Sequence, residues 1–261
     1  MRAPADQDPW LPLRRFTAAR IALGRAGSSL PTREVLAFGL AHAQARDAVH
    51  HRLDHGVLEA ALAAAGWAPP IHVHSAAPDR AHYLRRPDAG RRLDDASRAR
   101  LAAATPTDAP DVVLVVADGL SALAAERHAV PVIAALRPLL AGWRIGPVVV
   151  AEQSRVALGD EIGAVLRARQ VVMLIGERPG LSSPDSLGLY LTHGPRPGLT
   201  DAERNCISNV RPEGLAYPLA AARLAHLLAG ARALGKSGVA LKDDSATTAL
   251  TSPQAAGPGD G

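Results

Sequence analysis

Short apolar runs that alternate with helical segments restrict the fold of this chain more than any other feature. The runs Val112–Ala117 and 171–175 are continuous, rich in β-branched residues, and each ends at a turn signal, Asp118-Gly119 or Gly176-Glu177. Runs of that length predict buried strands. Further strands are predicted at 71–74, 147–151 and 187–192, and helices at 94–104, 120–127, 130–140 with Pro138 as a break, 158–167 and 219–234. This alternation predicts an α/β fold with a mostly parallel, doubly wound sheet.

The composition and the hydrophobic pattern divide the chain into four parts. Residues 1–9 are expected to form a flexible arm, and residues 10–70 a small helical N-terminal domain with helices at 10–23, from Thr32 to about 50, and at 58–65. Residues 71–242 carry the strand–helix alternation. Residues 243–261 are rich in Ser, Thr, Ala, Gly and Pro and are predicted to be a disordered tail.

The composition argues against several classes of function. The formal net charge is +4, but the arginines are spread among acids without interleaved aromatic residues, so nucleic-acid binding is not expected. A single cysteine excludes an internal disulfide and a cysteine-rich metal site. No stretch resembles a secretory signal or an apolar membrane span, so we expect a soluble, cytoplasmic protein.

The segment 171–209 is the strongest candidate for a ligand site. Its strand ends at Gly176, and Glu177 and Arg178 follow at the carboxyl edge of the sheet, where doubly wound proteins bind ligands. The next thirty residues show no clear helix and run to the only cysteine, Cys206, so we interpret them as a long functional loop. The alternative is that Glu177 and Arg178 pair with each other or with neighbours and only fasten the loop.

Other candidates have equally good structural explanations. His51 and His55 have the spacing of metal ligands on a helix, but Arg52 stands where a zinc protease has its general-base Glu, so we interpret them as helix-end residues. His72 and His74 have the spacing of ligands on one face of a strand, but no third ligand is evident. Asp118 could contact a ligand or cap the next helix. Cys206 could be a nucleophile or a small buried residue. Arginines that could clamp an anion or form a solvated loop lie at Arg85, Arg86, Arg91 and Arg92. The residues include no nucleotide-binding loop, no nucleophile elbow and no complete catalytic set.

Six ordered segments resemble one family. These are LRRFTAARIALGRAGSSLPTREVLAFGLAHAQARDAVH at 13–50, YLRRPDAGRRL at 83–93, VVADGLSALA at 115–124, RVALGDEIG at 155–163, LIGERPGLSSPDSLGLYLT at 174–192 and DAERNCISNVRPEGLAY at 201–217. Together they resemble the small (light) subunit of adenosylcobalamin-dependent ethanolamine ammonia-lyase, in order over about residues 10–242.

The resemblance implies a function that the residues alone do not. Enzymes of this family convert ethanolamine to acetaldehyde and ammonia by radical chemistry that the cofactor, adenosylcobalamin, supplies. A large subunit, a TIM barrel, holds the substrate, and the two kinds of subunit assemble into a hetero-oligomer with cobalamin between them. The small subunit is expected to pair a helical N-terminal part with a Rossmann-like part. Members of the family also work inside bacterial microcompartments, although the N-terminal arm here is not a clear targeting helix.

The resemblance also implies the cobalamin contacts, which fall on Val156, Glu177 and Cys206. We expect Val156 to make apolar contact, Glu177 to accept hydrogen bonds from amide groups, and Cys206 to be a small neighbour. The D-x-H-x-x-G signature that supplies a histidine to cobalt is absent, so the cofactor is expected to keep its own base on cobalt. A stand-alone α/β binding or regulatory protein is the alternative function.

Overall fold

A computed structural model describes residues 8–17 and 19–244. Nearly all of the predicted tail and most of the predicted N-terminal arm therefore lie outside the described residues. The strands are β1 (Ile71–His74), β2 (Val112–Ala117), β3 (Val149–Glu152), β4 (Gln170–Gly176), β5 (Leu187–His193) and β6 (Arg204–Val210). The α-helices are α1 (Thr32–His50), α2 (His55–Ala64), α3 (Arg80–Arg85), α4 (Asp95–Ala103), α5 (Ala122–Leu136), α6 (Leu158–Val165) and α7 (Tyr217–Leu234). Short 3-10 helices are η1 (Leu11–Phe16), η2 (Ala89–Arg91), η3 (Arg137–Leu140), η4 (Asp201–Glu203) and η5 (Gly238–Ala240).

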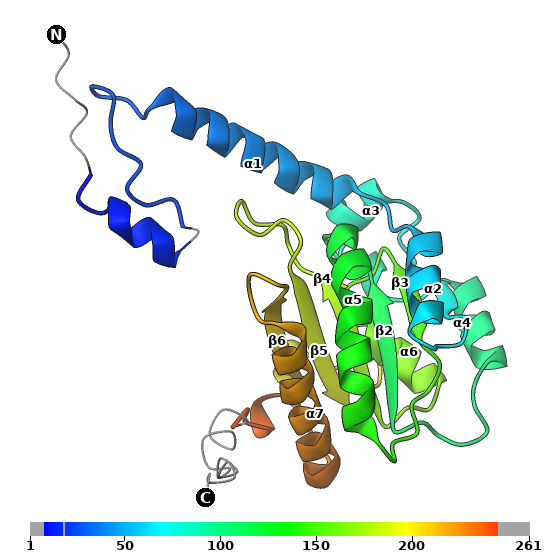
Figure 1. The fold of residues 1–261 in the computed structure, drawn as a ribbon. Helices are drawn as coiled ribbons and strands as arrows, with labels where there is room; N and C mark the ends of the chain where they lie inside the picture. The colour runs from blue at the N-terminus through cyan, green and yellow to red at the C-terminus, as the bar shows by residue number, and fades with distance from the viewer. Residues whose placement is uncertain (1–7, 18, 245–261) are drawn as a thin grey trace, which may run out of the picture.

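The six strands form one sheet in the order β1-β3-β2-β4-β5-β6 (Figure 1). The first four in space pair in parallel, whereas β5 and β6 are antiparallel to their neighbours. From β2 the chain winds to β3 on one side and then crosses to β4 on the other. The strand order therefore reverses around β2, which places the topological switch point at its carboxyl end. The predicted α/β fold, with an N-terminal helical region and a mostly parallel sheet, is confirmed.

Each face of the sheet is covered by its own helices. On one face the even-numbered side chains of β2 and β4 pack with α2, α5 and α7, in a core of aliphatic residues. On the other face the odd-numbered side chains of the same strands pack with α4 and α6. Such alternation follows from the period of two along a strand, and burial on both faces explains why β2 and β4 are continuously apolar. No helix within 8–17 and 19–244 has the length and apolar character that crossing a bilayer requires.

The N-terminal segment departs from the prediction. A helix was expected over 10–23, but only the 3-10 helix η1 forms, and none of its residues is buried. A short helix without a packing partner is unstable, and no surface formed by the described residues buries this one. The next helix, α1, begins at Thr32 as expected and projects from the body (Figure 1). Farther along, α2 packs on α5 and contributes Leu58 and Leu62 to the sheet's core.

Two further corrections concern helix continuity and a strand. The helices predicted at 120–127 and 130–140 are one continuous helix, α5, with Pro131 inside it. The α-helix ends at Leu136, just before Pro138, and the chain continues as η3, so the predicted break at Pro138 is confirmed. The strand predicted at 187–192 forms as β5, but the rest of the predicted loop contains a further strand, β6, so Cys206 lies within a strand and not at a loop end.

Candidate functional site

An open cavity of about 420 Å³ lies at the switch point of the sheet. The segments that follow β2, β3 and β4 all contribute to it, together with α3 and β5. Its lining residues are Tyr83, Gly119, Leu120, Arg155, Val156, Ile175, Gly176, Glu177, Arg178 and Tyr190. A second cavity of about 400 Å³ adjoins it and shares Arg155 and Val156. The surface is therefore a broad shelf with apolar and aromatic walls and charged groups at its edge.

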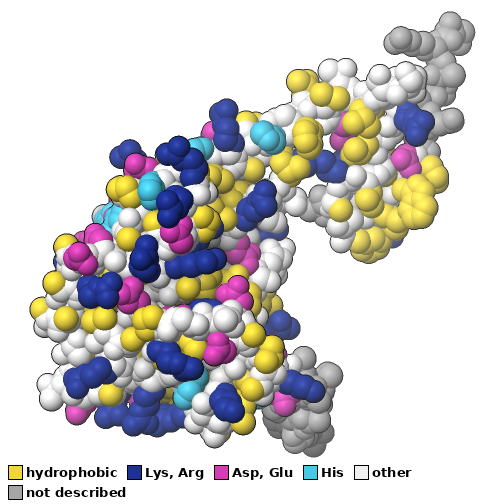
Figure 2. Space-filling model, turned by 180° about the vertical axis from the view of Figure 1, so that it is seen from behind, with side chains coloured by type: hydrophobic (Ala, Val, Ile, Leu, Met, Phe, Trp, Pro, Cys, Tyr) yellow, Lys and Arg dark blue, Asp and Glu magenta, His cyan; other side chains and the backbone are white. Residues whose placement is uncertain are grey.

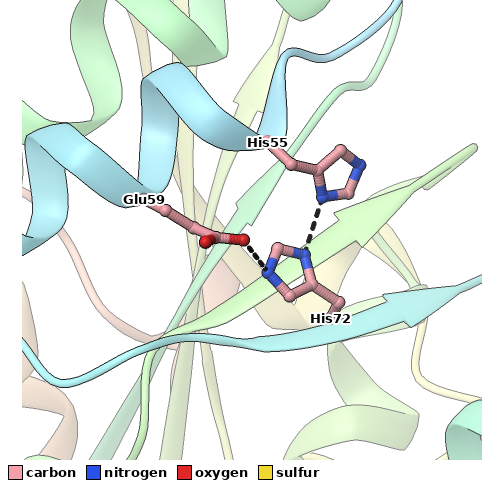
Figure 3. A group of neighbouring side chains, drawn as sticks. All are labelled: His55, Glu59 and His72. Atoms are coloured by element: carbon pink, nitrogen blue, oxygen red, sulfur yellow. Dashed lines mark hydrogen bonds and ion pairs between the residues drawn. The ribbon is translucent and has the colours of Figure 1, made fainter.

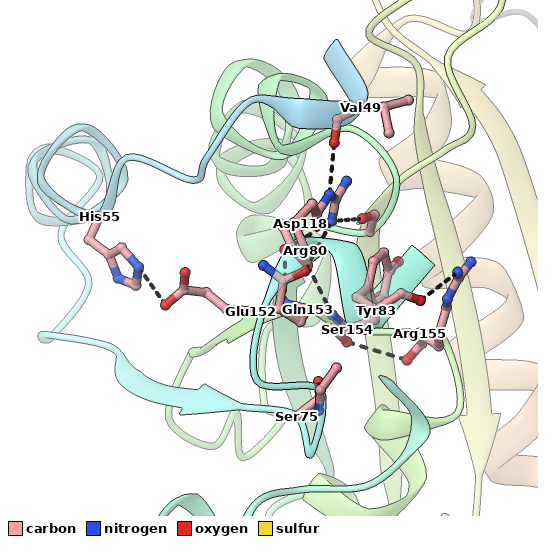
Figure 4. Close-up of polar contacts among 12 residues, drawn as sticks. Val49, His55, Ser75, Arg80, Tyr83, Asp118, Glu152, Gln153, Ser154 and Arg155 are labelled. Atoms are coloured by element: carbon pink, nitrogen blue, oxygen red, sulfur yellow. Dashed lines mark hydrogen bonds and ion pairs between the residues drawn. The ribbon is translucent and has the colours of Figure 1, made fainter. Parts of the chain in front are cut away.

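Asp118 fixes the loop that carries Val156. Its buried carboxylate accepts hydrogen bonds from the backbone N–H groups of Gln153 (2.8 Å) and Ser154 (3.0 Å), as Figure 4 shows. Gln153 has a φ of 51°, which a residue with a Cβ seldom adopts, and the hydrogen bond from its N–H stabilises it there. Burial raises the pKa of Asp118 to about 6 against the opposing effect of these N–H donors and Arg80. Neither role predicted for Asp118 is seen, since Ser121 caps α5 and Asp118 does not line the cavity.

Tyr83 supports the same loop from the other side. Its ring is fully buried between the guanidinium groups of Arg155 and Arg80, whose Cζ atoms lie 4.2 and 4.7 Å from the ring centroid. Its hydroxyl donates to the carbonyl oxygen of Ser154 at 3.0 Å (Figure 4). Burial raises the pKa of this hydroxyl well above its usual range, so it remains a donor. The segment 83–93 therefore contributes Tyr83 to the first cavity and Arg91 to the second. The four arginines considered as an anion clamp are all exposed, and Arg85, Arg86 and Arg92 line neither cavity.

Two glycines let the strand ends meet closely beneath the cavity. A Cβ added to Gly176 would lie 1.9 Å from the carbonyl oxygen of Ser121, and one added to Gly119 would lie 2.2 Å from that of Gly176. Gly119 also has a φ of +55°. Both contacts are far below van der Waals distance, so any larger residue would force the ends of β2 and β4 apart.

Glu177 follows β4 directly and points toward the antiparallel strands. Its N–H donates to Ser186 O at 3.0 Å, and its carboxylate oxygen Oε2 accepts from Asn209 N–H at 3.2 Å. Gly188 leaves room for this side chain, because a Cβ there would lie 3.1 Å from Glu177 Oε1. Within the described residues Glu177 and Arg178 form no ion pair with each other. Glu177 is partly accessible and Arg178 is exposed.

Cys206 reaches the cavity through Tyr190. The two residues are direct partners in the register of β5 and β6, so their side chains lie next to each other on one face of the sheet. Cys206 is exposed as a residue, but neighbouring atoms partly desolvate its thiol. This desolvation, together with the charge of Glu177, raises the pKa of the thiol. A raised pKa does not suit a nucleophile. The structure thus places Val156 and Glu177 in one cavity, with Cys206 behind its Tyr190 wall.

An ion pair joins β6, which carries Cys206, to α6, which begins two residues after Val156. Arg204, the first residue of β6, contacts Asp160 of α6, and each side chain is only 2% exposed. Arg204 also donates to Asp201 Oδ1 and to Leu199 O, both at 3.1 Å. Burial raises the pKa of Asp160 to about 6, whereas Arg204 lowers it. Since both charges are buried, the pair fixes α6 against β6.

The histidines do not associate as the sequence suggested. His51 contacts the Glu126 carboxylate of α5 at 3.0 Å, and His74 Nδ1 contacts Ser75 O at 2.7 Å. His55 and His72, one from each predicted pair, contact each other instead.

Some residues of the cavity were predicted from the sequence, and others were not. The end of β4 indicated Glu177, whereas Val156 and Cys206 were predicted from the family resemblance. Tyr83, Arg155 and Tyr190 were not identified as site residues, because their contacts join segments 16 to 72 residues apart. The only available signal was that all three lie in segments that resemble the family.

Fold and cavity together define a doubly wound α/β protein with an open cavity at its switch point. The family model of the ethanolamine ammonia-lyase light chain (EutC) matches residues 7–242. Ethanolamine ammonia-lyase small subunits of Pseudomonas aeruginosa and Ralstonia nicotianae are each 58% identical, over 94% and 92% of this chain and 90% of each relative. That of Pseudomonas syringae pv. tomato is 57% identical over 97% of this chain and 89% of the relative. The chain belongs to the ethanolamine ammonia-lyase light-chain family.

Proposed function

We propose that this chain provides one side of an adenosylcobalamin site in an ethanolamine ammonia-lyase and that a large subunit completes it. The cavity at the switch point carries this proposal. It is a wide shelf with apolar walls and a charged edge, which suits a flat, largely apolar corrin ring with amide arms around it. A corrinoid is larger than the cavity and its neighbour together, so this chain alone would cover only part of the cofactor.

The residues fit such a ligand in distinct ways. Val156 is partly buried in the shelf and offers an apolar surface to a corrin face. Glu177 uses Oε2 for Asn209, which leaves Oε1 to accept a hydrogen bond from an amide arm. Cys206 acts as a small neighbour through its contact with Tyr190. No histidine lines either cavity, which supports a cofactor that keeps its own base on cobalt.

When bound, the cofactor supplies the radical that begins the reaction at ethanolamine. The side chains of this chain bind, orient and shield one face of the ligand, and none of them takes part in catalysis. Tyr83 and Asp118 keep the β3–α6 loop in place, so Val156 is positioned before the ligand arrives. Conversion of ethanolamine to acetaldehyde and ammonia then belongs to the large subunit, a TIM barrel, and needs both subunits.

The projecting N-terminal segment supports assembly with a larger partner. Its large hydrophobic side chains are exposed in unusual number for a free surface (Figure 2), namely Trp10, Leu11, Leu13, Phe16, Leu30, Val35, Leu36, Phe38 and Leu40. A hetero-oligomer would bury them. Such an enzyme would be cytoplasmic, and its enclosure in a bacterial microcompartment is a further expectation from the family.

The test measures cobalamin binding and subunit assembly separately, in a complex reconstituted from this chain and its large subunit. Glu177→Ala should weaken cobalamin binding by roughly 10- to 100-fold, the effect of losing one hydrogen bond to a charged group. Assembly, followed by size-exclusion chromatography, should be unchanged. Glu213→Ala, at an exposed carboxylate beyond β6, should alter neither.

Two results would contradict the proposal. Equal loss of binding and assembly in Glu177→Ala would make Glu177 a structural fastener. A chain that stays monomeric beside a large subunit and gives no cobalamin-dependent ammonia release from ethanolamine would favour the stand-alone binding protein.

A further inference from the structure

Four side chains form a cluster at the outer edge of the sheet, apart from the cavity residues. His55 and Glu59 lie one turn apart on α2, and His72 faces them from the edge strand β1 (Figure 3). Glu152, the last residue of β3, contacts His55 (Figure 4). None of the four lines the switch-point cavity.

The contacts form a continuous chain from one carboxylate to the other. Glu152 Oε1 lies 2.9 Å from His55 Nε2, His55 Nδ1 lies 2.7 Å from His72 Nδ1, and His72 Nε2 lies 2.7 Å from Glu59 Oε1. An ionised carboxylate only accepts hydrogen bonds, so each Nε2 carries a proton. A neutral imidazole protonated on Nε2 has its lone pair on Nδ1. The carboxylates therefore orient both rings so that two Nδ1 lone pairs face one point.

This arrangement matches a transition-metal site with its supporting shell. Metal-bound histidines usually donate their other N–H to a carboxylate, which fixes the tautomer and raises the basicity of the ligand nitrogen. Two nitrogens bound to a tetrahedral zinc ion at about 2.0–2.1 Å lie roughly 3.3 Å apart. The two Nδ1 atoms, now 2.7 Å apart, would need to separate by about 0.6 Å. Both rings are about one-third exposed and have room for that movement.

The local charge also favours a cation. Two carboxylates meet here, and across residues 8–17 and 19–244 no arginine or lysine pairs with either of them. Arg100, the nearby base, donates instead to the backbone carbonyl of His72. Imidazole nitrogens select zinc, copper and nickel over magnesium and calcium, which prefer oxygen ligands.

We propose that His55 and His72 bind a divalent transition-metal ion, zinc in the first instance, through their Nδ1 atoms. Glu152 and Glu59 orient the two rings, and water completes the coordination. The ion links α2 to β1 and so fastens the N-terminal helical segment to the edge of the sheet. The site is independent of the proposed cobalamin surface.

The test is zinc titration of the full-length, tag-free chain in competition with a chromophoric chelator. The wild-type chain should bind one zinc ion with a Kd in the micromolar range or tighter. The double variant His55→Ala/His72→Ala should lose this binding. Glu59→Ala/Glu152→Ala should weaken it by roughly 10- to 100-fold, as removal of outer-shell carboxylates does. The control is His226→Ala, which removes a histidine of α7 that pairs with Asp244 and should leave zinc affinity unchanged.

A measurement on the wild-type chain removes any dependence on how the variants fold. X-ray absorption of the zinc-loaded protein should show two imidazole nitrogens, with oxygen in the remaining positions. Zinc bound through sulfur would place the ion at Cys206 and overturn the proposal. So would binding that persists in the double histidine variant, or wild-type protein that binds no zinc at micromolar concentrations.

Discussion

Replacing Arg204 by methionine should destabilise the chain far more than the loss of an ion pair at the surface would. The guanidinium lies against Asp160 with both side chains 2% exposed, and it also satisfies Leu199 O. Methionine preserves the aliphatic stem but leaves the Asp160 carboxylate buried without a counter-ion. Breaking one partner of a buried pair costs about 3–5 kcal/mol of the free energy of unfolding. The same change would loosen β6 from α6, and with them the two sides of the shelf.

The assay is urea unfolding of the wild type and Arg204→Met at pH 7.5 and at pH 5. Burial already raises the pKa of Asp160 to about 6 while Arg204 opposes that rise, so removing Arg204 should raise it further. At pH 5 the variant's carboxyl group is then neutral, and the loss of stability should shrink. Arg196→Met, which removes an exposed arginine near the same turn, should behave like wild type. A small loss at pH 7.5, or one that is the same at both pH values, would refute this account of the pair.

Three further predictions concern the shelf and its support. The pKa of Asp118 in the folded chain is about 6, above its ordinary value of 3.8. The protonated carboxyl group therefore contributes stability that is fully present below about pH 4 and is lost as the pH rises through 6. Urea unfolding across this pH range should show the decline in wild type and a flatter curve for Asp118→Asn. Gly176→Ala should lower the free energy of unfolding by about 1–3 kcal/mol, because the added Cβ would collide with Ser121 O. Gly39→Ala, at an open position on α1, should raise it by roughly 0.5–1 kcal/mol. Equal effects of the two changes would contradict the packing argument. Cys206 should react with iodoacetamide more slowly at neutral pH than a free cysteine, because its pKa is raised, and fast reaction would contradict the crowding of its thiol.

The sequence predicted the parallel part of the sheet well, for a simple physical reason. The strands β2 and β4 are buried on both faces, so nearly every residue must be apolar, and such runs are visible without any structure. Because the carboxyl ends of parallel strands share one edge, Glu177 and the loop after β3 could be placed together in advance.

The antiparallel edge was harder to predict. In β6 only Arg204, Ile207 and Val210 are buried, so the strand shows neither an apolar run nor strict alternation. One of those buried residues is charged, and its burial depends on Asp160, 44 residues earlier. Pairing of this kind is a property of the tertiary structure, and for that reason the segment was predicted to be a loop.

The helix predicted at 10–23 does not form, for a related reason. The apolar pattern at 10–23 is real, but a pattern forms a stable helix only when another surface covers its apolar face. Among the described residues of this segment, Trp10, Leu11, Leu13 and Phe16 remain exposed. A partner that covers them would supply the missing surface, which agrees with the proposed assembly.

The central claim is that the shelf at the carboxyl ends of β2, β3 and β4 holds one side of the cofactor. A crystal structure of the complex with its large subunit, solved with cobalamin bound, tests it most directly. We predict a corrin ring in contact with Val156 and an amide arm that donates to the Glu177 carboxylate. A corrin bound wholly within the large subunit, or at another edge of this sheet, would contradict the account.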